Sequence, residues 1–394
     1  MARILFVWEV GKGFGHLSPY LALVSALKLK GHEVIFAARD VGNAEQIFGK
    51  HGVPILQAPI MMHKVSNPYR NQHSFVHILH NNGFGDRTNL LGLVKSWRYL
   101  YEQVRPDLAI FDYSPTAMLA ARDYSWKRIV SGSGFLIPPS TVPLPLLRYW
   151  LQYDQERLLE EEGRLLANMN FVMESLGLAR FKSVSELYDT DDIFLLGFEE
   201  MDHYPQRVGG NYLGMFSLPG HGVAPQWPTD SGRRIFAYLH PYRNLKSLLE
   251  LLRNPRFSTL IYAPGVPDAG KKHYSGKHLA FTDDPIDITR VAGECDIAVT
   301  NATFGTTAAL LLCGRPVLCI PTNLERLMVG RRVLDMGAGL AVPQSTPEKV
   351  RPALKALLTQ DRFAAAAGRF RDKYAHLDLN WQTDQMLNIL HRLV

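Results

Sequence analysis

The first 40 residues switch between the two hydrophobic periods that distinguish strands from helices. Residues 4–8 are continuously apolar, as in a strand buried on both faces, and a glycine-rich turn follows at 11–15. Apolar residues then recur at helical spacing over 17–27, before a second apolar run at 33–38. A strand, a turn, a helix and a strand in this order predict a βαβ unit, and therefore a parallel sheet with helices on both faces.

The same order of elements continues along the rest of the chain. Prolines and glycines are dense between 217 and 232, which is typical of a linker. We therefore predict an α/β protein whose two domains, 1–217 and 233–380, are joined by a linker at 218–232. Further strands are expected at 53–57, 108–111, 129–131, 235–239, 259–262, 279–281, 297–299 and 317–320, and helices at 89–104, 245–252, 306–312 and 381–394.

Composition and charge exclude several classes of protein. Of the 394 residues, 46% are hydrophobic and 20% charged, which is ordinary for globular proteins and excludes a fibrous or disordered chain. The 43 Lys and Arg exceed the 37 Asp and Glu by six. This surplus is too small to predict a nucleic-acid partner, although it suits a phosphorylated ligand or peripheral contact with an anionic membrane surface. No apolar stretch reaches the roughly 18 residues that a spanning helix needs.

The three cysteines, Cys295, Cys313 and Cys319, are expected to be buried and reduced. Each lies in an apolar context, their number is odd, and no cysteine–histidine spacing typical of a metal site surrounds them. The apolar run at 4–8 is too short for the core of a signal peptide. Reduced thiols without a signal peptide predict a cytoplasmic location.

A histidine stands at the end of the first glycine-rich turn. The spacing of that turn matches neither a dinucleotide fingerprint nor a phosphate-binding P-loop. His16 is nevertheless expected at the carboxyl edge of the first strand, where open α/β sheets bind ligands and an imidazole can take a proton from a hydroxyl. Asp112 ends an apolar strand of the same sheet and could orient His16. The alternatives are a packing histidine, and an aspartate that caps a helix or is simply solvated.

A second polar group follows two strands in the latter half of the chain. After the strand at 297–299, a polar turn containing Gly305 leads into a helix whose first backbone N–H groups could hold a phosphate. Thr306 and Thr307 add hydroxyl donors, unless they only cap a core helix. Glu325 and Arg326 follow the strand at 317–320 and are suited to hydroxyls and to an anion. Their alternative is an exposed ion pair.

Other motifs carry less weight. Residues 189–191 (Asp-Thr-Asp) match a metal–nucleotide pattern that is common by chance, and no cluster has metal-ligand spacing. His73, His77 and His80 recur at helical spacing and are interpreted as a polar helix face or the wall of a cleft. No G-x-S-x-G motif occurs, which argues against a serine hydrolase.

Taken together, these segments resemble the GT-B glycosyltransferases, and among them the UDP-glycosyltransferases and bacterial macrolide glycosyltransferases. The resemblance extends over almost the whole chain. It implies two Rossmann-like domains facing each other across a cleft, the first binding an acceptor and the second a nucleotide sugar, with the helix at 381–394 packing back on the first. It is carried by Gly15-His16-Leu17-Ser18-Pro19, residues 29–34, 295–300, Gly305-Thr306-Thr307, 314–318, 321–325 and 336–339.

The resemblance also implies a role for individual residues. His16 corresponds to the catalytic base, and Asp112 to the carboxylate that supports it. Backbone around Pro285 and Ile286 corresponds to the segment that holds the nucleobase. The positions implied for the rest of the donor are Asn301, Gly305, Thr306 and Thr307 at the diphosphate, Glu325 at the sugar hydroxyls, and Arg326 beside them.

Two departures from the family pattern affect the donor. Asn301, Ala302 and Thr303 stand where members typically carry a histidine and two glycines, and Arg326 stands where many carry glutamine. Asparagine still donates a hydrogen bond but cannot become cationic. The donor therefore need not be UDP-glucose, and either a UDP-linked or a dTDP-linked sugar is expected.

The function implied is that of an inverting, metal-independent hexosyltransferase whose acceptor is a hydroxyl of a small molecule or a lipid. It needs no cofactor besides the nucleotide sugar, because a helix start and Arg326 absorb the leaving charge. The alternatives are a sugar-nucleotide epimerase on the same fold and an inactive glycosyltransferase-like partner protein. An open, apolar, proline-rich loop at 135–147 favours an acceptor and so a transferase, while His16 and Asp112 argue against an inactive partner.

Overall fold

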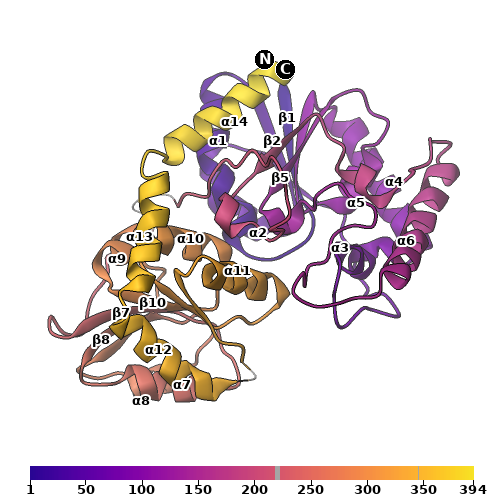
Figure 1. The fold of residues 1–394 in the computed structure, drawn as a ribbon. Coiled ribbons are helices and arrows are strands. Elements are labelled where there is room, and N and C mark those ends of the chain that lie inside the picture. The colour runs from indigo at the N-terminus through magenta and orange to yellow at the C-terminus, as the bar shows by residue number, and fades with distance from the viewer. Residues whose placement is uncertain (218–221, 345) are drawn as a thin grey trace. The chain divides into compact units, whose positions relative to one another are not determined.

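The computed structural model describes residues 1–217, 222–344 and 346–394. The chain divides into two compact units, each with its own six-stranded parallel sheet (Figure 1). Unit 1 comprises Met1–Gly214 and Asn380–Val394, and unit 2 comprises Met215–Leu379. Within the described residues, no helix is long and apolar enough to cross a membrane.

The sheet of unit 1 has the strand order β3-β2-β1-β4-β5-β6. Its central strands are almost wholly buried because helices cover both faces, which explains their uninterrupted apolar sequences. In the register of the sheet, Trp8 at the end of β1 lies beside Asp112 at the end of β4. The strands are β1 Arg3–Trp8, β2 Glu33–Ala38, β3 Ile55–Gln57, β4 Leu108–Asp112, β5 Lys127–Gly132 and β6 Asp192–Leu195.

The helices of unit 1 differ from the expected ones at the first turn. Instead of a helix that begins at residue 17, two short 3-10 turns, Phe14–His16 and Ser18–Tyr20, precede α1. Pro19 lies in the second turn and has no N–H to donate. The helices are α1 Leu21–Leu29, α2 Val41–Phe48, α3 Phe75–Leu79, α4 Arg87–Val104, α5 Pro115–Ala120, α6 Gln155–Ser175 and α14 Leu379–Leu393.

Unit 2 repeats the arrangement with the strand order β12-β11-β10-β7-β8-β9. The order reverses between β10 and β7, and in such sheets ligands bind at the carboxyl ends of the strands around that point. Helices α7 and α12 share a core with one face of the sheet. The strands are β7 Arg233–Tyr238, β8 Phe257–Tyr262, β9 Leu279–Thr282, β10 Ile297–Thr300, β11 Val317–Cys319 and β12 Gly339–Ala341. The helices are α7 Leu245–Leu252, α8 Asp268–Tyr274, α9 Ile288–Glu294, α10 Phe304–Leu312, α11 Leu324–Asp335, α12 Val350–Thr359 and α13 Arg362–Tyr374.

The segment predicted as a linker is partly packed on unit 2. Residues 218–221 lie outside the described residues. Beyond them, Val223 pairs with Ile286, and the indole of Trp227 donates to Glu294 over 2.7 Å. The described part, 222–232, is therefore held by side-chain and backbone contacts rather than being a free connector.

The loop at 135–147 is open only at 140–142, where Val142 is 64% exposed. The side chains of Phe135, Ile137, Leu144 and Leu147 are all buried. The apolar composition of this loop therefore reflects core packing, and it no longer distinguishes a transferase from an epimerase.

All three cysteines are free thiols, as expected. Burial raises the pKa of Cys295 and of Cys319 to about 12, so both stay protonated. Cys313 differs from the expectation because it is only partly buried.

Candidate active site

A histidine and an aspartate meet at the carboxyl edge of the unit 1 sheet. The Nδ1 atom of His16 lies 2.6 Å from Oδ1 of Asp112, and the Asp112 side chain is 6% exposed against 18% for His16. Asp112 is a carboxylate with little access to water, so its bond to His16 is worth more than the same contact on the surface. It favours the tautomer with the proton on Nδ1, which leaves the lone pair on Nε2.

A buried tyrosine holds the other oxygen of the same carboxylate. The Tyr20 hydroxyl lies 2.6 Å from Oδ2 of Asp112 and 2.7 Å from Oγ of Ser131. Burial and the neighbouring Asp112 raise the pKa of Tyr20 well above 10, so the phenol remains a donor. The helical spacing over 17–27 places Tyr20 only on an apolar helix face. Its polar role could not be found from the sequence, because Asp112 and Ser131 are 92 and 111 residues away.

Backbone and rings fix the orientation of the His16 imidazole. It stacks on the indole of Trp8 with centroids 5.4 Å apart and an interplanar angle of 18°. Gly11 has a φ of +97°, and a Cβ on it would collide with Nε2 of His16, so glycine is required there. Tyr113, directly after Asp112, has a φ of +44°. Such strained residues persist where the surroundings force them, as they do at active sites.

The predicted phosphate site lies at the start of α10 in unit 2. Gly305 is in the first turn, and a Cβ built there meets no atom within 4 Å. The fold itself thus does not require glycine at 305, whereas close approach of a ligand would. Within the described residues, the buried hydroxyls of Thr303 and Thr307 have no hydrogen-bond partner. Thr306, in the same turn, is partly exposed.

Asn301 uses its side chain to join three strands. Its Oδ1 accepts from the backbone N–H of His240 at 2.5 Å, and its Nδ2 donates to the carbonyl of Ile320 at 2.9 Å. These residues follow β7 and β11, the two neighbours of β10 in the sheet. The side chain is thus engaged with backbone, and contact with a phosphate stays a prediction. Ala302, the next residue, has a φ of +59°.

The other predicted donor residues surround the same edge of the sheet. Ile286 is buried, and the backbone on either side of it pairs with Val223. Gly222, with a φ of +115°, packs so closely that a Cβ would meet the backbone of 285–287 at 2.6 to 2.7 Å. Glu325 and Arg326 lie in the first turn of α11, both partly exposed, and Nη1 of Arg326 donates to the Thr322 hydroxyl at 2.6 Å.

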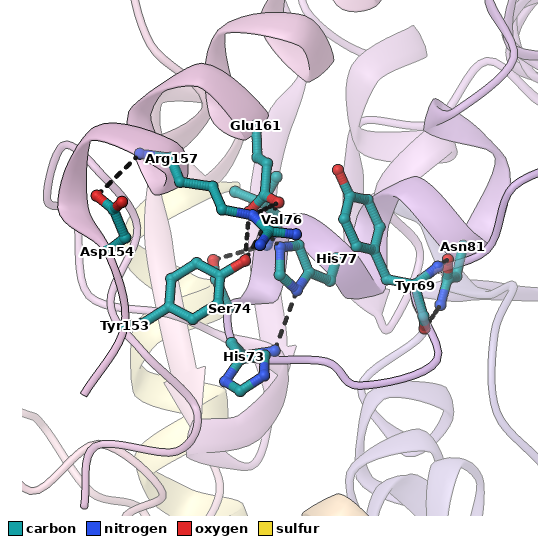
Figure 2. A network of polar contacts seen from close by, with 10 residues as sticks. All are labelled: Tyr69, His73, Ser74, Val76, His77, Asn81, Tyr153, Asp154, Arg157 and Glu161. Atoms are coloured by element: carbon teal, nitrogen blue, oxygen red, sulfur yellow. Dashed lines mark hydrogen bonds and ion pairs between the residues drawn. The ribbon is translucent and has the colours of Figure 1, made fainter. Parts of the chain in front are cut away.

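The histidines at 73–80 do not form a polar helix face. His77 lies on α3 and is fully buried, and its Nε2 is 2.7 Å from Oε2 of Glu161 on α6 (Figure 2). Its Nδ1 accepts from the backbone N–H of His73, which fixes the neutral tautomer. Arg157 and Tyr153 also donate to Glu161. The sequence pattern missed this network because it does not show that α6 packs on α3.

The His77 network should make unit 1 sensitive to acid. Burial lowers the pKa of His77 below 6.5, so in acid the unfolded chain binds a proton that the folded unit does not. Stability is therefore complete above pH 6.5 and falls as the pH drops below it, by up to about 1.4 kcal/mol per pH unit. His77→Gln should flatten the fall in melting temperature between pH 7 and pH 5. The exposed His63, changed to Gln, is the matched control, and equal slopes in both variants would contradict the prediction.

The Asp-Thr-Asp motif at 189–191 has a structural role. Asp191 accepts from Nζ of Lys127 and from the backbone N–H of Arg128, both at 2.9 Å. Across the described ranges, no group of three or more acidic, histidine or cysteine side chains has the geometry to hold a metal ion.

The chain is similar to known proteins in sequence and in structure. No protein-family model matches the chain. It is 23% identical over 432 aligned residues to the 4'-demethylrebeccamycin synthase of Lentzea aerocolonigenes, which covers 96% of each chain. Its structure matches CalG4, the calicheamicin glycosyltransferase, with a TM-score of 0.73 at 16% identity over 100% of this chain and 99% of that one. It also matches the glycosyltransferase VinC, solved in complex with dTDP, with a TM-score of 0.70 at 17% identity over 99% and 100%.

These matches test the predictions made from the sequence. The resemblance to GT-B glycosyltransferases and the two-domain GT-B fold are confirmed. The predicted enzyme class, a glycosyltransferase, agrees with the proteins that the chain matches along nearly its whole length.

Proposed function

From the GT-B fold and the site at each sheet edge, we propose that this protein is an inverting glycosyltransferase. It transfers a sugar from a nucleoside-diphosphate sugar to a hydroxyl group of a small-molecule acceptor. The observation that carries the proposal is the hydrogen-bonded chain from Tyr20 through Asp112 to His16. These hydrogen bonds orient the His16 imidazole at the carboxyl edge of the unit 1 sheet, where a general base for an acceptor hydroxyl is needed.

The chemistry is a single displacement. Nε2 of His16 takes the proton of the acceptor hydroxyl as its oxygen bonds to the anomeric carbon. The bond from that carbon to the diphosphate oxygen breaks on the opposite side, which inverts the configuration. Asp112 stabilises the imidazolium that forms. In unit 2, the N-terminal turn of α10 and Arg326 stabilise the negative charge of the leaving diphosphate.

A dTDP-linked sugar is the preferred donor. The support for it is the match along the whole chain to VinC, whose structure contains dTDP. The acceptor is proposed to be a small molecule because the matched CalG4 is named for calicheamicin and the matched synthase for a rebeccamycin.

Since α10 and Arg326 are proposed to stabilise the charge of the leaving diphosphate, we expect transfer to continue in the presence of EDTA.

The test is acceptor-dependent release of nucleoside diphosphate. The protein is incubated with dTDP-glucose or UDP-glucose, with and without a panel of aromatic and macrocyclic alcohols, and the free nucleotide is measured. We expect release only when an acceptor is present, and a product whose anomeric configuration by NMR is opposite to that of the donor. Equal release without acceptor, or a retained configuration, would contradict the proposal.

A further inference from the structure

His240 lies two residues beyond β7, at the edge of the unit 2 sheet where α10 begins. Ile235, Ala237 and Leu239 belong to the core shared with α7 and α12, so alternation along the strand turns Tyr238 and His240 toward the other face. The rings of Tyr238 and His240 are 5.3 Å apart. Arg326, in the first turn of α11, lies close enough to act electrostatically on both of them.

Two hydrogen bonds tie this segment to the turn that precedes α10. The backbone N–H of His240 donates to Oδ1 of Asn301, and the backbone N–H of Asn301 donates to the carbonyl of Tyr238. The side chain of Asn301 is engaged with the backbone at 240 and 320. The imidazole beside this turn is that of His240, which follows β7.

The surroundings of His240 suit an anion. The residue is partly buried, and burial together with Arg326 lowers its pKa below 6.5. The groups that face it are the arginine on α11 and the phenol of Tyr238, behind which Tyr262 is stacked at 5.3 Å. Burial raises the pKa of both phenols, so they are neutral near pH 7. No hydrogen bond from the described residues occupies the imidazole of His240.

We propose that His240 binds the diphosphate of the nucleotide sugar through its imidazole, beside the N-terminal turn of α10 and Arg326. This inference rests on the proposed function, since it assumes that unit 2 binds a nucleotide sugar. The Asn301 side chain then holds the backbone at residue 240 in place and does not contact the ligand itself. Asn301 thus positions His240, which binds the diphosphate.

Calorimetric titration with dTDP-glucose in the absence of acceptor tests the proposal. We expect His240→Ala to weaken binding about ten- to 150-fold, the range for a lost hydrogen bond to a charged group. His240→Gln keeps a donor and should lose less affinity. His273→Ala is the matched control, because His273 is an exposed histidine on α8 and should leave binding unchanged.

Proton uptake separates direct contact from a structural effect. A bound diphosphate raises the pKa of a contacting imidazole, so the wild type should take up protons near pH 6, and its affinity should rise as the pH falls. dTDP-glucose is chosen because its esterified phosphates do not titrate there. Uptake is measured as the dependence of the binding enthalpy on the ionisation enthalpy of the buffer, and both His240 variants should abolish it.

The outcomes are distinguishable. Binding by the wild type with unchanged affinity and uptake in both His240 variants would overturn the role of His240 and leave the proposed function standing. Weakened binding in His240→Ala with proton uptake intact in His240→Gln would also overturn it, because it would indicate a structural effect. Wild-type protein that binds neither dTDP-glucose nor UDP-glucose would overturn both proposals. Melting curves confirm that the variants fold, which we expect because the bond from residue 240 to Asn301 uses backbone N–H.

Discussion

Replacement of His16 by alanine is expected to lower kcat by about 100-fold or more, the usual loss when a general base is removed. Tyr20, which is bonded to the second oxygen of Asp112, cannot take over as the base because its phenol keeps its proton. The measurement is the initial rate of nucleoside diphosphate release at saturating acceptor. The exposed His63, changed to Ala, is the matched control and should leave kcat unaltered.

Donor affinity distinguishes a base from a binding residue. The residues proposed to hold the donor belong to unit 2, whereas His16 belongs to unit 1. The dissociation constant for dTDP-glucose should therefore change little in His16→Ala. A loss of donor affinity as large as the loss of kcat would remove the assignment of His16 as the base.

The Asp112→Asn variant is expected to lose turnover on the order of 100- to 10⁴-fold. The equivalent change in catalytic triads reaches about 10⁴ because an amide N–H can face Nδ1 and drive the proton onto the nitrogen that must accept one. Here the same change also disturbs the Tyr20 bond to the second oxygen. The readouts are kcat and the nitrogen chemical shifts of the His16 ring, which report its tautomer.

Tyr20→Phe is the companion to that variant. It removes one hydrogen bond to a charged group, worth about 1.5–3 kcal/mol, but leaves both carboxylate oxygens and the His16 contact. We therefore expect turnover to fall less than in Asp112→Asn. Turnover of Asp112→Asn within a factor of three of the wild type would mean that the carboxylate has no part in orienting the base.

Periodicity predicted the elements whose buried faces are apolar. The ranges expected for β2 and α7, 33–38 and 245–252, agree with the structure. Helix α6, with 21 residues, was not predicted because its buried face includes Glu161, Glu162 and Asn170, which interrupt the apolar pattern. Helix α11 was not predicted either, because charged residues interrupt its apolar pattern. The hydrophobic pattern of a short segment cannot predict that its polar residues are buried, because their partners lie elsewhere in the sequence.

The candidate site was predictable where it follows from strand ends. Open α/β sheets bind ligands at the carboxyl ends of their strands, and this rule predicted His16 and Asp112, which the structure brings within hydrogen-bond distance. Applied to the strand at 235–239, the same rule would have found His240, which the sequence analysis did not single out. The bonds of Asn301 could not be predicted, because its partners at 240 and 320 become neighbours only through the strand order.

Because of helix α14, unit 1 can be completed only after the whole of unit 2 has been translated. This helix belongs to unit 1, where Gln382 donates to the carbonyl of Gly214 at 2.8 Å and Met386 and Leu390 are buried, yet it is translated after the whole of unit 2. Unit 2 is contiguous and can close as soon as it leaves the ribosome, whereas unit 1, although its sheet is made first, waits with the apolar docking site of α14 uncovered. Residues 215–379 are therefore synthesised before unit 1 can be completed, and a ribosome that stalls in that interval leaves unit 1 without α14.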